Sequence, residues 1–187
     1  MQNGKFFLLV IILFFHNCKS YIVINSEILY STITLTDSKI QFQVPSHWEI
    51  FFSSKRFFHF YGKDPNQVYG PMMEYRGLPN PTKTKTEREQ YASGWYKAIN
   101  LNYKNWNYIE KNYIEIEFNN KKIYSYQFLG SFDDGQVKVK KLGFLRFFDD
   151  RIHAIYYTCE DFTFTQCMDT FMKIDNSINY EPKIPTY

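Results

Sequence analysis

The stretch Lys122-Ile-Tyr-Ser-Tyr-Gln-Phe-Leu129 decides the fold of this chain, because aromatic and polar residues alternate along it. Successive side chains of a β-strand point to opposite faces of a sheet, so Tyr124, Tyr126 and Phe128 would share one face. Ser125 would lie on the other face. The pattern therefore predicts a strand with one aromatic and one polar face.

Turn signals on the C-terminal side extend this strand into an antiparallel meander. Asp133-Asp-Gly135 is a strong hairpin signal, and it leads into an expected strand at Gln136–Phe148. Asp149-Asp-Arg151 marks a second turn, which leads into Ile152–Thr158. Each strand would pair with the one before it.

The segment Tyr108–Phe118 also alternates toward its end. Ile114 and Ile116 are expected to face the core, and Glu115 and Glu117 to face solvent. On a solvent-facing side these carboxylates would pair with basic side chains across strands, and would not form an acid/base pair. The lysines expected opposite them are Lys138 and Lys140.

A helix is predicted on each side of this meander. The first runs from Glu87 to about Leu101, and two capping boxes are available, Thr84 with Glu87 and Thr86 with Glu89. Its expected apolar stripe is Tyr91, Trp95, Ala98 and Ile99. The second runs from about Phe162 to Ile178, with Asp161 or Thr163 as its N-cap. Its expected stripe is Phe164, Cys167 or Met168, Phe171, Ile174 or Met172, and Ile178.

The residues before the first helix predict further strands. Thr32–Val44 is expected to form one long strand or a strand pair, and Leu78–Thr86, with two Pro, a loop. The other expected strands are Glu49–Phe52, Arg56–Tyr61 and Gln67–Arg76, the last weakened by Gly70 and Pro71.

This order of elements is typical of the α+β class. We expect an antiparallel sheet of about six to seven strands packed against two main helices, in a single domain over residues 32–180. Residues 181–187, which include Pro182 and Pro185, are expected to be a tail outside the fold.

The arrangement resembles the PsbP-like fold, which is shared by the photosystem protein PsbP and by small bacterial lipoproteins of the DcrB type. The resemblance rests on the segment Phe42-Gln-Val-Pro45-Ser-His-Trp48, the mid-chain helix, the meander with its aspartate turn, and the closing Ile174-Asp-Asn-Ser177-Ile178. It implies a binding or scaffolding domain and not an enzyme, although a fold by itself fixes no activity.

The N-terminus is typical of an export signal. Lys5 precedes an apolar run from Phe6 to Phe15, which is too short to span a bilayer, so residues 1–17 are expected to be a signal peptide. Cys18 follows and resembles the acylated cysteine of a bacterial lipobox, although Phe15-His16-Asn17 departs from the usual pattern. Residues 18–31 would then be the lipidated Cys and a tether. The alternatives are an ordinary signal peptide and an uncleaved anchor.

The remaining cysteines, Cys159 and Cys167, form an even pair once Cys18 is assigned to lipid. In an oxidising compartment such a pair is expected to form a disulfide. Two buried free thiols are the alternative. A metal site made of this pair and His153 has no recognised spacing.

Composition and motifs point away from several functions. A formal net charge of +3 gives no reason to expect nucleic acid as a partner. The sequence contains no nucleophile elbow, phosphate loop, dinucleotide fingerprint or zinc-protease motif, so no catalytic residue, cofactor or metal is expected.

The segment Tyr69–Tyr75 stands out, because Met72 and Met73 are adjacent and cannot face one core from the same strand. One of them would line a ligand or partner groove, unless both faces of the strand are covered. The residues assigned to this candidate groove are Tyr69, Met72, Met73, Tyr75, His47 and Trp48.

We therefore expect a non-catalytic binding module in the bacterial cell envelope, in the periplasm or on the outer surface. It would be held to the membrane by an acyl anchor at Cys18. Its partner would be an envelope protein or a small apolar ligand. The alternatives are an exported enzyme that uses His47, His153 and a carboxylate, and a purely structural envelope protein.

Overall fold

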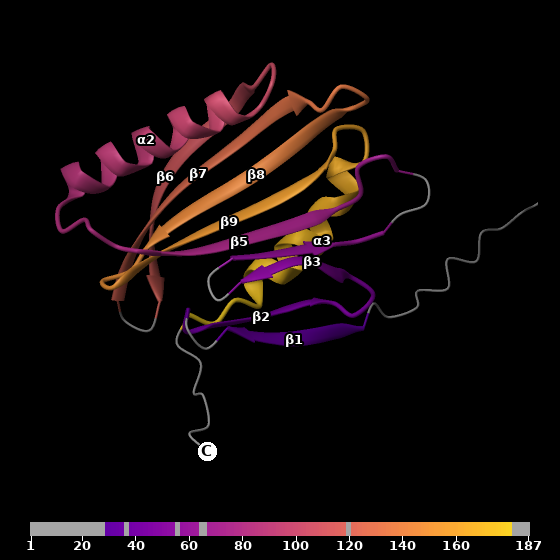
Figure 1. Cartoon of the computed structure of the whole chain (residues 1–187). Helices are drawn as coiled ribbons and strands as arrows, with labels where there is room; N and C mark the ends of the chain where they lie inside the picture. The colour runs from indigo at the N-terminus through magenta and orange to yellow at the C-terminus, as the bar shows by residue number, and fades with distance from the viewer. Residues whose placement is uncertain (1–28, 36–37, 55–56, 64–66, 119–120, 181–187) are drawn as a thin grey trace, which may run out of the picture.

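The computed structural model describes residues 29–35, 38–54, 57–63, 67–118 and 121–180. Within them, a seven-stranded sheet separates two layers (Figure 1). Helix α2 (Lys85–Asn102) covers one face, the α2 side; helix α3 (Phe164–Asn176) and a two-stranded sheet cover the other, the α3 side. The leader, Cys18 and the tail lie outside the described residues, as does the expected tether up to residue 28. Tyr30 and Ser31, which had been assigned to the tether, instead begin strand β1 (Tyr30–Leu35). In the described part of the chain, no helix is both long and apolar enough to cross a membrane.

The strands of the large sheet are β3 (Glu49–Ser54), β4 (Phe57–Tyr61), β5 (Met72–Pro79), β6 (Asn107–Phe118), β7 (Lys121–Asp133), β8 (Lys138–Phe147) and β9 (Arg151–Glu160). Their order is β3-β4-β5-β9-β8-β7-β6, and every neighbouring pair is antiparallel. β6 to β9 form the predicted meander, and β5 pairs with its last strand. The structure confirms the α+β class.

Helix α2 begins at the first of the two predicted capping boxes. The Thr84 hydroxyl accepts a hydrogen bond from the backbone N–H of Glu87 at 3.2 Å, and the Glu87 carboxylate accepts one from the backbone N–H of Thr84 at 2.9 Å. Two N–H groups without a helical partner are thereby satisfied.

The face of α2 that meets the sheet is centred on Ala92 and Ile99, which are buried. The prediction for Ala98 was wrong: this residue is exposed, because the contact face follows positions 92, 95, 96 and 99. The aromatic residues of α2 that pack partly buried on the sheet are Tyr91, Trp95 and Tyr96.

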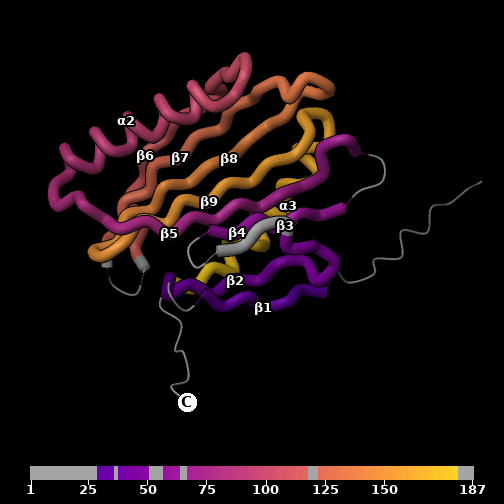
Figure 2. Tube along the Cα trace, in the orientation of Figure 1, coloured from indigo at the N-terminus to yellow at the C-terminus, as the bar shows by residue number. Residues whose placement is uncertain are grey.

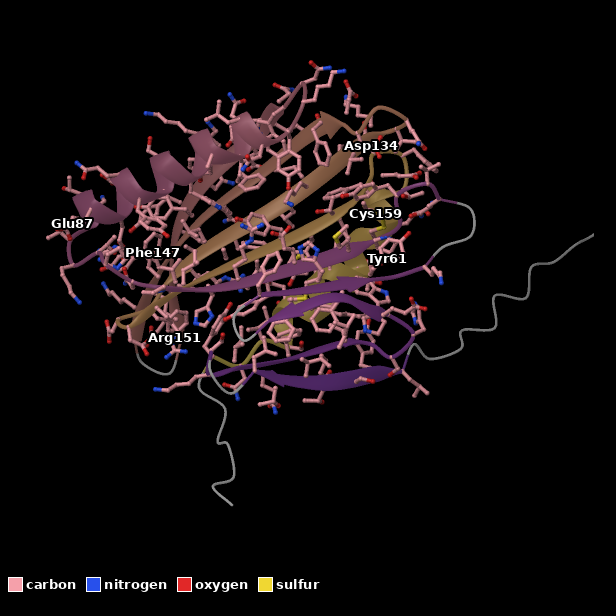
Figure 3. All side chains as sticks on the ribbon, in the orientation of Figure 1. Tyr61, Glu87, Asp134, Phe147, Arg151 and Cys159 are labelled. Carbon is pink, nitrogen blue, oxygen red and sulfur yellow. A yellow bond between two sulfur atoms is a disulfide. The ribbon has the colours of Figure 1, made fainter. Side chains whose placement is uncertain are left out.

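Helix α3 presents the predicted stripe to the sheet, and Phe164, Phe171 and Ile174 are buried. A disulfide joins Cys167 in this helix to Cys159 near the end of β9, with Cα atoms 6.9 Å apart (Figure 3). The bridge attaches the start of α3 to the neighbouring strand.

The first strands form a separate hairpin of β1 (Tyr30–Leu35) and β2 (Ile40–Pro45), which is the strand-pair alternative for the N-terminal segment. β2 buries Ile40, Phe42 and Val44 on the α3 side. Gln41 exchanges backbone hydrogen bonds of 2.8 and 2.7 Å with Asn179, so the hairpin also holds the chain after α3.

Strand β6 corrects the orientation predicted for Tyr108–Phe118. Ile114 is 41% exposed and Ile116 is only partly buried, because β6 is the last strand of the sheet. Glu115 lies 4.0 Å from Lys122, and β7 separates β6 from the strand that carries Lys138 and Lys140. Those two lysines instead contact Asp161, at 3.7 and 2.6 Å.

Strand β5 begins later and ends later than the predicted Gln67–Arg76. Its ladder with β9 runs from Met72 opposite Thr158 to Pro79 opposite Arg151. Pairing with β9 therefore extends the strand into the segment for which the two Pro residues had predicted a loop.

Candidate binding surface beside helix α2

Strands β4 and β5 carry side chains that face the α2 side but lie beyond the helix. Glu74 on β5 is paired with Tyr156 on β9, and Tyr156 accepts a hydrogen bond of 2.6 Å from the Trp95 indole of α2. Paired residues share a face, which places these β5 side chains on the α2 side. Figure 2 shows α2 along β6 and β7, with β4 and β5 across the sheet from them. We call this surface the open strip: Phe57, His59, Tyr61, Met72, Glu74 and Arg76.

Buried charges lie at the centre of the open strip. The residue Glu74 is 5% exposed; its carboxylate contacts the Arg76 guanidinium at 2.6 Å and the Lys141 ammonium at 3.2 Å. His59 Nε2 lies 3.5 Å from the same carboxylate. The Lys141 ammonium is buried and donates a hydrogen bond of 2.6 Å to the Tyr103 hydroxyl.

The cluster keeps both buried groups charged. Burial by itself would raise the pKa of Glu74, but the hydrogen bond from His59 and the charges of Lys141 and Arg76 hold this pKa well below its usual range. Burial would lower the pKa of Lys141, but the carboxylate of Glu74 outweighs it, so this pKa is raised. Neither group is poised to exchange a proton near neutral pH, as a general acid or base must be.

Arg76 is the member of this charged cluster that reaches the surface. Its side chain is 48% exposed, and its guanidinium lies 4.6 Å from the centre of the half-buried Phe57 ring. The carboxylate of Glu74 and this ring hold an otherwise flexible side chain in place. Protein interfaces are enriched in arginine and aromatic residues fixed in this way. No group of His, Cys, Asp and Glu able to hold a metal occurs among the described residues.

The predicted groove residues His47 and Trp48 line a different feature, a cleft of about 190 Å³ between the end of β2 and α3. Gln166 and Thr170 of α3 line it too, as does the disulfide-bonded Cys167. Ligand pockets for small molecules usually measure about 300–1,000 Å³, so this cleft is small for such a ligand.

The structure divides the remaining groove residues between the core and the surface, which corrects the single groove that was predicted. Met73 and Tyr75 are completely buried on the α3 side, because alternate residues of β5 point into that core. Met72 lies on the open strip. Tyr69 is half-buried, and its backbone N–H donates a hydrogen bond of 2.5 Å to Glu160.

The histidines proposed for an enzyme are not brought together. His47 is exposed at the cleft beside Cys167, whereas His153 is completely buried. On β9, His153 lies six residues from the disulfide-bonded Cys159, about 20 Å along a strand. Its Nδ1 is 2.9 Å from the Tyr75 hydroxyl within the core.

Sequence reasoning missed the pair of Glu74 and Lys141, although one signal was present. Lys140 and Lys141 are adjacent in a predicted strand, so their side chains must point to opposite faces. One of them therefore faced inward and required an acidic partner. The pattern could not show which residue that partner would be. β5, which carries Glu74, and β8, which carries Lys141, come close together only in the folded sheet, on either side of β9.

Comparison with known proteins adds evidence on the fold. No protein-family model matches this sequence, and no curated protein matches it. Solved structures do match. The cyanobacterial PsbP of Synechocystis sp. PCC 6803 superposes with a TM-score of 0.59 at 13% identity, over 81% of this chain and 92% of that one. The fold is PsbP-like.

Two further solved structures that match this chain belong to a bacterial and a yeast protein. LpqN of Mycobacterium tuberculosis, described as involved in cell envelope biogenesis, has a TM-score of 0.56 at 14% identity, over 81% of this chain and 90% of that one. The Ran-binding protein Mog1p of Saccharomyces cerevisiae has a TM-score of 0.53 at 8% identity, over 82% and 96%. The PsbP-like resemblance drawn from the sequence is confirmed at the level of the fold.

Proposed function

We propose that this protein is a non-catalytic binding module that recognises a protein partner through the open strip. One observation carries the proposal: Arg76, held by the buried carboxylate of Glu74 beside the Phe57 ring, stands exposed among partly buried apolar side chains. A prearranged arginine beside aromatic rings loses little side-chain freedom when a partner binds. The names of two PsbP-like structures, an envelope biogenesis protein and a Ran-binding protein, are compatible with this role.

We further propose that the module is exported and anchored in the bacterial cell envelope by acylation of Cys18. The apolar run that precedes Cys18 supports this proposal, as does the pairing of Cys159 with Cys167, because Cys18 is the third of the three cysteines in the sequence. Metabolic labelling with an alkyne analogue of palmitate should label the wild-type protein and not the Cys18→Ala variant. Equal labelling of the two would refute acylation at this residue.

The binding role is tested by photo-crosslinking in cells that produce the full chain. A photoreactive phenylalanine analogue replaces Phe57 in the open strip or, as a matched control, Phe162, which is 71% exposed before α3. We expect a cross-linked product of one defined mass from position 57 and none from position 162. The same product from both positions, or none from either, would contradict recognition through the open strip.

A second substitution links the product to Arg76. Adding Arg76→Ala to the photoreactive position 57 should strongly reduce the cross-linked product, because truncation of a central interface residue costs about 2 kcal/mol or more of binding energy. Lys122→Ala, which removes an exposed cation from β7, serves as the control and should leave the yield unchanged. An undiminished product in the Arg76→Ala variant would show that the partner does not use this guanidinium.

A further inference from the structure

Strand β6 lies at one edge of the seven-stranded sheet. It is twelve residues long, and β7 is the one described strand that pairs with it. Three large apolar side chains on it are exposed: Ile109 at 52%, Tyr113 at 36% and Ile114 at 41%. A long edge strand with exposed apolar side chains offers free backbone N–H and C=O groups to another strand.

The geometry of antiparallel pairing limits how two copies of β6 could meet. In an antiparallel pair, two residues directly opposite each other either both point their backbone N–H and C=O groups toward the partner strand or both point them away. A two-fold axis between identical strands must therefore lie midway between one residue and its own copy. Registers centred on Glu110, Lys111 or Glu115 would place identical charges against each other, which is unfavourable.

A register centred on Tyr113 is complementary to itself. The two Tyr113 side chains would face each other, and Lys111 of each copy would lie opposite Glu115 of the other, so two opposite-charge pairs would form. Within one copy, the interactions of these two charges lie on the exposed surface. Glu115 is 4.0 Å from the exposed Lys122 and accepts a hydrogen bond of 3.2 Å from the Tyr113 hydroxyl, and the Lys111 ammonium lies 3.9 Å from the centre of the Tyr108 ring.

We propose that the protein forms a homodimer in which two copies of β6 pair antiparallel about Tyr113 and join their sheets into one. The dimer covers the exposed Tyr113 and Ile114 and satisfies the outer backbone groups of both strands. The open strip lies on β4 and β5, separated from β6 by β9, β8 and β7, and stays accessible. The inference goes beyond the proposed partner binding and does not depend on it.

Disulfide trapping tests the register. Tyr113→Cys is introduced into the full chain carrying Cys18→Ser, so that it adds the one thiol outside the bridge of Cys159 and Cys167. Mild oxidation should convert most of this variant to a covalent dimer, since Tyr113 faces its own copy. Leu101→Cys, at a position 84% exposed on α2, is the matched control and should stay monomeric. Failure of Tyr113→Cys to cross-link, or more efficient cross-linking by Ile114→Cys, would overturn the register.

A charge swap tests the association itself. Sedimentation equilibrium should show a dimer for the wild-type full chain and a dimer dissociation constant raised at least about tenfold by Lys111→Glu, because two attractive pairs become repulsive. Lys111→Glu combined with Glu115→Lys should restore the wild-type constant. Both sites are exposed, so circular dichroism should be unchanged. A monomeric wild type, or equal constants for the wild type and Lys111→Glu, would refute the dimer.

Discussion

The α3 side and the α2 side of the sheet differ in how completely they are covered. On the α3 side, the helix and the hairpin of β1 and β2 enclose a continuous core in which Phe42, Tyr75 and Phe171 are completely buried. On the α2 side, the helix buries Ala92 and Ile99 and leaves its aromatic rings partly exposed. One side of the sheet is thus fully enclosed, and the other leaves part of the sheet uncovered.

The buried charged residues on the two sides of the sheet also differ in how completely they are enclosed. On the α3 side, the Arg146 guanidinium contacts Asp175 at 2.6 Å and also donates a hydrogen bond to the Tyr180 hydroxyl, all within the core. On the α2 side, the pair of Glu74 and Lys141 reaches solvent through Arg76. Burying an ion pair costs desolvation energy that its attraction often fails to offset, so such pairs are weak evidence for stability. We interpret the α3-side pair as holding the last turn of α3, and the α2-side pair as positioning a surface residue.

The largest expected effect comes from truncating one ring on each side. Phe171→Ala should lower the free energy of unfolding by about 3–5 kcal/mol, because it leaves a cavity in the closed core. Tyr91→Ala on α2 should cost only about 1–2 kcal/mol, because its ring is partly exposed. Urea denaturation of both variants measures the difference. Equal losses would mean that the two sides are equally closed.

The disulfide provides the next effect. Cys159 and Cys167 are 8 residues apart in sequence, and a bridge across so short a loop restricts the unfolded chain by about 2–3 kcal/mol. Cys167→Ser should lose about this much stability. Adding a reductant should destabilise the wild type and leave the variant unchanged. Two thiols that react with an alkylating agent before reduction would instead show that the bridge is absent.

Lowering the pH should destabilise the protein through His153, which is buried on the α3 side. Burial, together with the positive charges of Arg151 and Arg146, lowers the pKa of His153 to about 3. The His153 side chain is therefore protonated near pH 6.5 in the unfolded chain but stays neutral in the folded protein. The free energy of unfolding consequently falls as the pH decreases below about 6.5. Between pH 6.5 and 5 the loss due to this residue should be about 1.6 kcal/mol.

The His153→Phe variant isolates this contribution. Its unfolding free energy, measured by urea denaturation at both pH values, should fall by about 1.6 kcal/mol less than that of the wild type over the same interval. An identical pH dependence in both proteins would show that folding does not lower the pKa of His153.

The smallest change in stability is expected for a substitution on the outer surface of α2. A methyl group added at Gly94 would meet no atom within 4 Å, so Gly94→Ala should raise the stability by about 0.5–1 kcal/mol through helix propensity alone. Gly135→Ala makes the same chemical change in the hairpin turn, where φ is +100°, and should destabilise. Thermal unfolding of the two variants should shift in opposite directions. A destabilised Gly94→Ala variant would indicate that this surface of α2 is covered.

Local patterns predicted most of the elements correctly. The turn at Asp133-Asp-Gly135, the alternation in β7 and the apolar stripe of α3 each follow from residues close together in the chain. The placement of Cys159 at a strand end and Cys167 in a helix was predicted for the same reason, and the structure joins them. The prediction failed for Ile114, because alternation shows that a strand has two faces but not whether a neighbour covers either.

The sequence by itself therefore determined the kinds of elements, their order and the α+β class, since these depend on spacings of two to four residues. The tertiary structure alone decided that β5 pairs with β9, which leaves β6 at the edge and brings Glu74 to Lys141. Those two residues are 67 positions apart. Contacts over such distances depend on which strands pair, and many pairings satisfy the same local pattern until the whole core is packed.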